Sequence, residues 1–237
     1  MDASTGCQYA VTILNTKVKV FGGLVLLLAG MAALLFVPAG TLNYWQAWIF
    51  LAVYFGWSLG VTLYLVRRDP VLLQRRMRGG PMAEKVPAQK IIMSLISVGF
   101  IGLLTIPALD HRFTWSRMPA YLALGGDVLV TLGYLTILLV LKVNSFSSST
   151  IELAADQKVI STGPYALVRH PMYAGALVML LGMPIALGSW WGVLVFVGMI
   201  PLLMWRLLDE EKFLGSRLAG YLEYQSSVRF RLLPGVW

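Results

Sequence analysis

Two polar segments interrupt an otherwise apolar sequence, and they hold the residues whose types and spacing could do chemistry. The first covers residues 142–173 and ends in STGPYALVRHPMY. Pro171 is favoured in the first turn of a helix, which places His170 beside free backbone N–H groups and the positive end of the helix dipole. Tyr173 follows on the same helix face. This arrangement can bind a carboxylate, but an interfacial helix start with aromatic anchors also explains it.

The second polar segment covers residues 205–224 and reads WRLLDEEKFLGSRLAGYLEY. Arg206 and Glu210 are four residues apart, on one face of a helix. Asp209, Glu210 and Glu211 come at the end of a long apolar run, where the helix dipole disfavours negative charge. A cationic ligand or a facing arginine would offset this cost. A solvated helix end with an Arg206–Glu210 pair is the alternative.

The composition indicates what kind of scaffold carries these two segments. Hydrophobic residues make up 58% of the 237 residues and charged residues only 13%, whereas a soluble domain has roughly 25% charged residues. This composition excludes a disordered chain and a coiled coil, which need a more polar sequence. We therefore predict an all-α polytopic membrane protein.

The apolar runs predict six membrane-crossing segments. A bilayer core of about 30 Å needs about 20 apolar residues in a helix. The run 172–205 is too long for one crossing, and Pro184 with Gly188-Ser189 predicts a helical hairpin whose tip lies near residues 184–189. Tyr44, Trp45 and Trp48 are expected to be interfacial aromatics. The other predicted spans are residues 20–37, 44–66, 91–109 and 120–141.

The basic residues predict the orientation. With these spans, all but two of the 19 Lys and Arg residues fall on one side of the membrane, and only Arg112 and Arg117 fall on the other. By the positive-inside rule the crowded side is cytoplasmic, together with both termini. The net charge of +8 is then explained by topology and by contact with the lipid bilayer, so we expect no nucleic-acid partner.

The predicted hairpin brings the two polar segments together at the cytoplasmic membrane surface, and we expect the active site there. Gly22-Gly23 and Gly125-Gly126 lie within predicted spans and indicate close helix packing. Asp127 lies in the outer half of its span, away from the site. We expect it to form a hydrogen bond with a neighbouring helix.

The two segments together resemble a known family. GPYALVRHPMYAG, followed by an apolar arm and then by EEKFL and GYLEY, is similar to the isoprenylcysteine carboxyl methyltransferases and the related phospholipid N-methyltransferases. The resemblance covers residues 142–237, which we expect to form the catalytic region after the spans in residues 1–141. The GPY turn and the short C-terminal tail resemble the prokaryotic branch.

The resemblance implies an integral membrane methyltransferase that uses S-adenosylmethionine. It implies that Arg206 contacts the substrate and that Arg206 and Glu210 are the catalytic residues. Glu210 is expected to bind the cofactor, with Glu211 as the alternative if the register slips by one. The remaining residues expected to bind the cofactor are Val159, Ile160, Tyr165, His170, Pro171, Met172 and Tyr173.

The resemblance leaves several lipophilic methyl acceptors open. A prenylcysteine-like carboxylate comes first, because Arg206 could bind it as a bidentate partner. A phospholipid amine and another small lipophilic molecule are the alternatives. A transporter and a sterol-type reductase with a nicotinamide cofactor are less favoured. We expect no metal, because the two histidines, His111 and His170, lie on opposite predicted sides of the membrane.

Overall fold

The fold was analysed in a computed structural model that describes the backbone of residues 3–77, 79–84, 86–154 and 156–237, and within these ranges the side chains from Val18 onward. The described part of the chain is all-helical, as predicted, and contains no strand. The helices are α1 (Ala3–Ala39), α2 (Trp45–Arg68), α3 (Pro70–Met77), η1 (Pro81–Ala83), α4 (Pro87–Phe113), α5 (Ala120–Val143), η2 (Gly163–Ala166), α6 (Pro171–Ala186), α7 (Trp190–Arg217) and α8 (Tyr221–Ser227).

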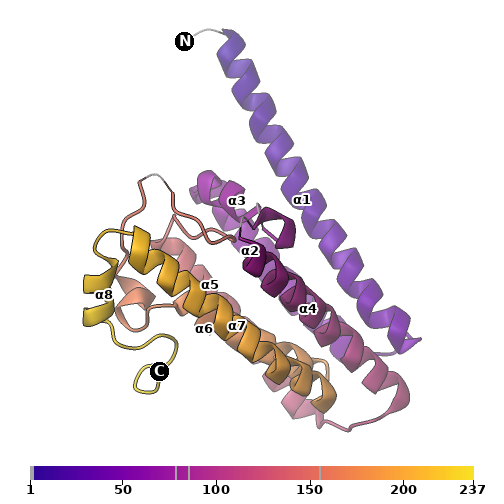
Figure 1. Ribbon diagram of the computed structural model, residues 1–237. Coiled ribbons are helices and arrows are strands. Elements are labelled where there is room, and N and C mark those ends of the chain that lie inside the picture. The colour runs from indigo at the N-terminus through magenta and orange to yellow at the C-terminus, as the bar shows by residue number, and fades with distance from the viewer. Residues whose placement is uncertain (1–2, 78, 85, 155) are drawn as a thin grey trace.

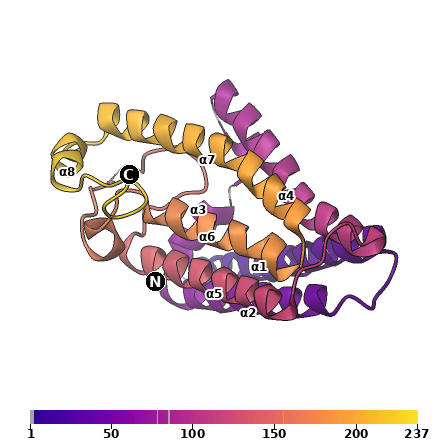
Figure 2. The same cartoon turned by 90° about the horizontal axis from the view of Figure 1, so that it is seen from below.

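Five of the described helices are long and apolar enough to cross a bilayer: α1 from Val18 onward, α2, α4, α5 and α7. The sixth predicted crossing is α6, whose 16 residues span only about 24 Å at 1.5 Å per residue. α6 and α7 are the two arms of the predicted hairpin and lie beside each other (Figures 1 and 2). Large apolar side chains such as Leu26, Val98 and Val197 remain exposed on the outside of the bundle, as expected for a surface that faces lipid.

The hairpin turn is formed by residues 187–189. Gly188 has φ +75°, a left-handed conformation that glycine adopts without steric cost. Ser189 then caps α7, because its Oγ accepts a hydrogen bond from the Gly192 backbone N at 3.0 Å. The Ser189 hydroxyl also donates to the buried carboxylate of Asp110. The turn is thereby fixed to the end of α4.

Tyr44 corrects one expectation about this end of the bundle. It is fully buried, rather than being an interfacial aromatic like the exposed Trp45 and Trp48. Its hydroxyl donates to the Leu187 carbonyl at 2.6 Å, and its ring stacks on His111 with centroids 4.0 Å apart. A buried tyrosine hydroxyl needs such a partner. Tyr44 therefore ties the start of α2 to the hairpin turn.

Glycines bring α5 and α6 into direct backbone contact. A Cβ on Gly126 would overlap the backbone nitrogen of Ala186, and a Cβ on Gly182 would lie 2.7 Å from the Gly126 carbonyl oxygen. The predicted close packing is confirmed at Gly126. It is wrong at Gly125, Gly22 and Gly23, where an added Cβ would meet nothing within 4 Å.

Asp127 follows Gly126 on α5 and is buried. Its Oδ1 accepts no hydrogen bond from the described residues. The expected hydrogen bond to a neighbouring helix is therefore not formed at this oxygen.

Candidate functional site

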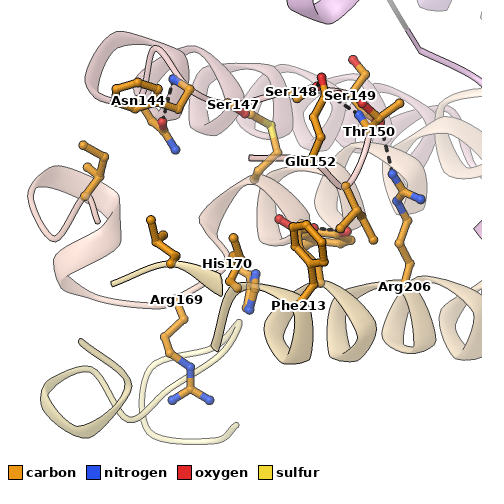
Figure 3. Close-up of a pocket in the computed structure, with 18 of the residues that line it drawn as sticks. Asn144, Ser147, Ser148, Ser149, Thr150, Glu152, Arg169, His170, Arg206 and Phe213 are labelled. Carbon is orange, nitrogen blue, oxygen red and sulfur yellow. Dashed lines mark hydrogen bonds between the residues drawn. The ribbon is translucent and has the colours of Figure 1, made fainter. Parts of the chain in front are cut away.

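One cavity of about 390 Å³ lies where the two polar segments meet (Figure 3). Its walls come from α6 and α7, from the connection between α5 and α6, and from α8. The hairpin brings these parts together, because its arms return the start of α6 and the end of α7 to the same end of the bundle (Figure 1). The residues expected to bind ligand that line this cavity are Val159, Ile160, Tyr165, His170, Met172, Tyr173, Arg206 and Glu210.

Tyr173 and Glu210 join the two hairpin arms inside the cavity. The Tyr173 hydroxyl donates to Glu210 Oε2 at 2.6 Å. The other carboxylate oxygen of Glu210 accepts no hydrogen bond from the described residues. Glu210 therefore presents negative charge to the cavity and has room to accept from a ligand.

His170 is the N-cap residue of α6 and lies beside Tyr173, with the two rings edge to face and their centroids 5.8 Å apart. It is only 5% exposed. Its Nε2 is buried and has no hydrogen-bond partner among the described residues, since the nearest carboxylate oxygen, Glu211 Oε1, is 3.6 Å away. Nε2 therefore faces Glu211 on the side away from the cavity, and the rest of the imidazole ring forms part of the cavity wall.

Glu211 lies outside the cavity wall, in a buried cluster of opposite charges. Its Oε1 accepts from Arg169 Nε at 2.6 Å, and its Oε2 accepts from Arg231 Nε at 2.7 Å. Both carboxylate oxygens are therefore occupied. Of the two adjacent acids, Glu210 faces the cavity and Glu211 faces the C-terminal segment.

The C-terminal segment after α8 is bound along the start of α6. The backbone N–H groups of Arg169 and His170 donate to the carbonyls of Phe230 and Arg231, both at 2.9 Å. Arg169 Nη1 also donates to the Val228 and Arg229 carbonyls. These contacts fix the residue before α6 and leave the His170 ring facing the cavity. The sequence did not reveal this role of residues 228–231.

Arg206 lines the cavity, but its charge is already compensated. Its Nη2 donates to Glu84 Oε1 at 2.6 Å and to the Ser149 carbonyl at 3.1 Å, while Nη1 donates to Gln89 Oε1 at 2.9 Å. Arg206 and Glu84 are both buried. The expected alternative, an Arg206–Glu210 pair on one helix face, is not what the structure shows. Glu84 lies 122 positions away, and no sequence pattern points to it.

The connection between α5 and α6 forms the roof of the cavity. Asn144 Nδ2 donates to the Tyr165 hydroxyl at 2.7 Å, and the Tyr224 hydroxyl donates to the Tyr165 carbonyl at 2.8 Å. Burial raises the pKa of Tyr165 to about 12, so this hydroxyl stays protonated near neutral pH. Tyr165 is thereby held between the loop, η2 and α8.

Pro171 and Glu211 are the two expected cofactor-binding residues that do not line the cavity. Pro171 starts α6 and is buried. The sequence analysis in turn missed lining residues from parts of the chain that carry no motif. These are Arg76 on α3 and Met93 and Ile96 on α4. Tyr221 and Tyr224 of the GYLEY segment on α8 also line the cavity, although no role was predicted for them.

Comparison with known families identifies the C-terminal half of this fold. Residues 121–218 match the family model PEMT, phospholipid methyltransferase. No curated protein gives a significant match to the sequence. Residues 121–218, from α5 to the end of α7, therefore form a domain of the phospholipid methyltransferase family. Together with the apolar helices, this domain supports a multi-pass membrane protein of the methyltransferase class.

Proposed function

We propose that the protein is an S-adenosylmethionine-dependent methyltransferase whose acceptor is lipophilic. The observation that supports it most is the pairing of Tyr173 and Glu210 beside the His170 ring, in one cavity between the hairpin arms. A cavity of about 390 Å³ lies within the usual range for small-molecule sites, about 300–1,000 Å³.

The residues present fit this cofactor chemically. Glu210 offers an anionic acceptor for a cationic amino or sulfonium group, and the His170 ring forms part of the wall beside it. Val159 and Ile160 supply apolar surface for an aromatic base. S-adenosylmethionine supplies an electrophilic methyl group on its sulfonium. The protein then has mainly to orient the two reactants and to exclude water.

The membrane side of the cavity favours a lipophilic acceptor. Met93 and Ile96 on α4, Leu180 on α6 and Leu203 on α7 line it, and they would contact an apolar tail that enters between the helices. We propose a prenylcysteine-like carboxylate as the first acceptor, on the resemblance of the RHPMY and EEKFL segments. A phospholipid amine is the second, favoured by the family match.

Calorimetric titration of the purified protein with S-adenosylmethionine and with NADPH tests the proposed function. We expect binding of S-adenosylmethionine alone, with a loss of about tenfold or more in Glu210→Gln and in His170→Ala, because the first removes the anionic acceptor and the second removes a ring from the cavity wall. Glu223→Gln on the exposed face of α8 is the matched control and should bind like the wild type. Equal affinity in all variants would refute the site, and binding of NADPH instead would favour a reductase.

A further inference from the structure

Among the described residues, three arginines line the cavity, and two of them already have a carboxylate partner within the protein. Arg169 pairs with Glu211, and Arg206 pairs with Glu84, each at 2.6 Å. The third is Arg76, for which no ion pair or side-chain hydrogen bond is found among the described residues. Arg76 is half-buried, and burial lowers its pKa. A partly desolvated guanidinium without an anion is unusual, because burying an unpaired charge is costly.

The position of Arg76 at the cavity is built by several contacts of α3. Leu72 and Leu73 anchor α3 in the bundle as buried residues. At the end of the helix, the Ser149 hydroxyl donates to the Arg76 carbonyl at 3.0 Å. Arg75 Nη1 donates to the Ser145 carbonyl at 2.9 Å, and its guanidinium lies 5.7 Å from the centre of the Phe146 ring.

A close contact between the chain after α3 and the connection between α5 and α6 also holds Arg76 at the cavity. A Cβ on Gly79 would come within 3.0 Å of Ser149 Cβ, so glycine allows the chain after α3 to lie directly against the cavity roof. Tyr165, which also lines the cavity, interacts electrostatically with Arg76. Arg76 is thus held facing the cavity from outside residues 121–218, the part of the chain that the family match covers.

We propose that Arg76 is the anion-binding residue of the cavity and takes a carboxylate or phosphate group of the bound ligand. Arginine suits this role because its planar guanidinium matches both groups in geometry. Lys158 also lines the cavity, but its side chain is exposed, where solvent screens its charge. The anion can belong to the cofactor of the proposed function or to the methyl acceptor. These two candidate sources rest on the proposed function, whereas anion binding by Arg76 does not.

Binding measurements in detergent can test Arg76 and distinguish the two sources. The variant is Arg76→Gln, and the matched control is Arg68→Gln, an exposed arginine at the end of α2. Lys158→Gln is compared with Arg76→Gln as the change at the exposed cation of the cavity. Each protein is titrated with S-adenosylmethionine, its decarboxylated analogue, N-acetyl-S-farnesylcysteine, the amide of that compound, and inorganic phosphate. Thermal melting and gel filtration establish that each variant is folded.

We expect Arg76→Gln to weaken one carboxylate ligand about tenfold or more, as for a lost charge-assisted hydrogen bond, and to weaken phosphate. The ligand that lacks the carboxylate should bind wild type and Arg76→Gln alike. If the affected pair is the cofactor pair, Arg76 holds the cofactor carboxylate; if it is the farnesylcysteine pair, Arg76 holds the acceptor. Arg68→Gln should stay within about twofold of wild type, and Lys158→Gln should lose less affinity than Arg76→Gln.

The proposal is wrong if Arg76→Gln binds all five compounds like the wild type, or if Lys158→Gln loses as much as Arg76→Gln. Both results would leave the proposed function intact, provided that the wild type binds S-adenosylmethionine. If the wild type binds neither that cofactor nor farnesylcysteine, the proposed function fails. In that case the phosphate titration still tests whether Arg76 binds an anion, because Arg76→Gln should bind phosphate more weakly than the wild type.

Discussion

Arg206 is a buried charge that needs a counter-ion and hydrogen-bond partners inside the protein. Its guanidinium is 8% exposed and Glu84 is 4% exposed, so each ion has lost most of its hydration. Gln89 completes the arrangement, because it accepts from Arg206 and its Nε2 donates to Asp209 Oδ2 at 2.7 Å. Glu84, in the segment before α4, therefore supports the cavity wall through Arg206. In this arrangement an anionic acceptor would compete with Glu84 for Arg206.

The Arg206–Glu84 pair leads to a stability prediction. Glu84→Gln leaves the guanidinium buried without a counter-ion, which costs about 3–5 kcal/mol when one partner of a buried pair is removed. The melting temperature in detergent should fall clearly. Glu84→Gln combined with Arg206→Met should lose less than the two single changes summed, because no unpaired charge remains. Glu223→Gln is the control, and an unchanged melting temperature in Glu84→Gln would show that the pair is not formed.

At the scale of the helices, the packing of α5 against α6 determines where the site residues lie. His170 and Tyr173 belong to the first turn of α6, so any shift of that helix moves both. The contact between α5 and α6 at Gly126 and Gly182 is made by backbone atoms. These atoms cannot move aside as a flexible side chain can. The glycines thus act on the cavity although they lie some distance along the helix from it.

Gly182 allows this dependence to be tested. In Gly182→Ala the new Cβ would lie 2.7 Å from the Gly126 carbonyl oxygen and from the Val130 backbone nitrogen. The helices must separate, and we expect a cost of about 1–3 kcal/mol together with weaker cofactor binding. Gly198→Ala is the matched control, since an added Cβ there meets nothing within 4 Å and alanine is the better helix former. Equal melting temperatures for the two variants would contradict the close α5–α6 contact.

The sequence predicted the helices and the hairpin, because span length, proline and glycine are local signals. It also predicted that the RHP and EE segments meet, since a hairpin returns its second arm to the same membrane surface. It could not choose between Glu210 and Glu211. Adjacent helix residues point about 100° apart, and the rotation of α7 is set by contacts with α4 and α6. The sequence pattern could not point to Arg76 or to Glu84, because only tertiary contacts bring Arg76 to the cavity and Glu84 to Arg206.

For the whole molecule, the two ends of the bundle differ in charge and in construction. The turn that follows α1, the loop that holds Arg117 and the hairpin turn lie together at one end, while α3, α8 and the cavity lie at the other (Figure 1). The cavity also draws on both parts of the chain, since Arg76 comes from residues 1–141 and His170 from residues 142–237. We propose that residues 142–237 carry the cofactor site and that the earlier helices complete it.

The charge difference between the two ends makes the orientation testable in cells. We propose that the cavity faces the cytoplasm, because basic residues near span ends are retained there. Single cysteines are introduced in a Cys7→Ser background, at Arg117 in the loop between α4 and α5 and at Glu223 on α8, both of which are exposed. A membrane-impermeant maleimide should label Arg117→Cys in intact cells and Glu223→Cys only after lysis. The reverse pattern would place the cavity on the outer face, away from the cytoplasmic supply of S-adenosylmethionine, and would count against the proposed function as well as the orientation.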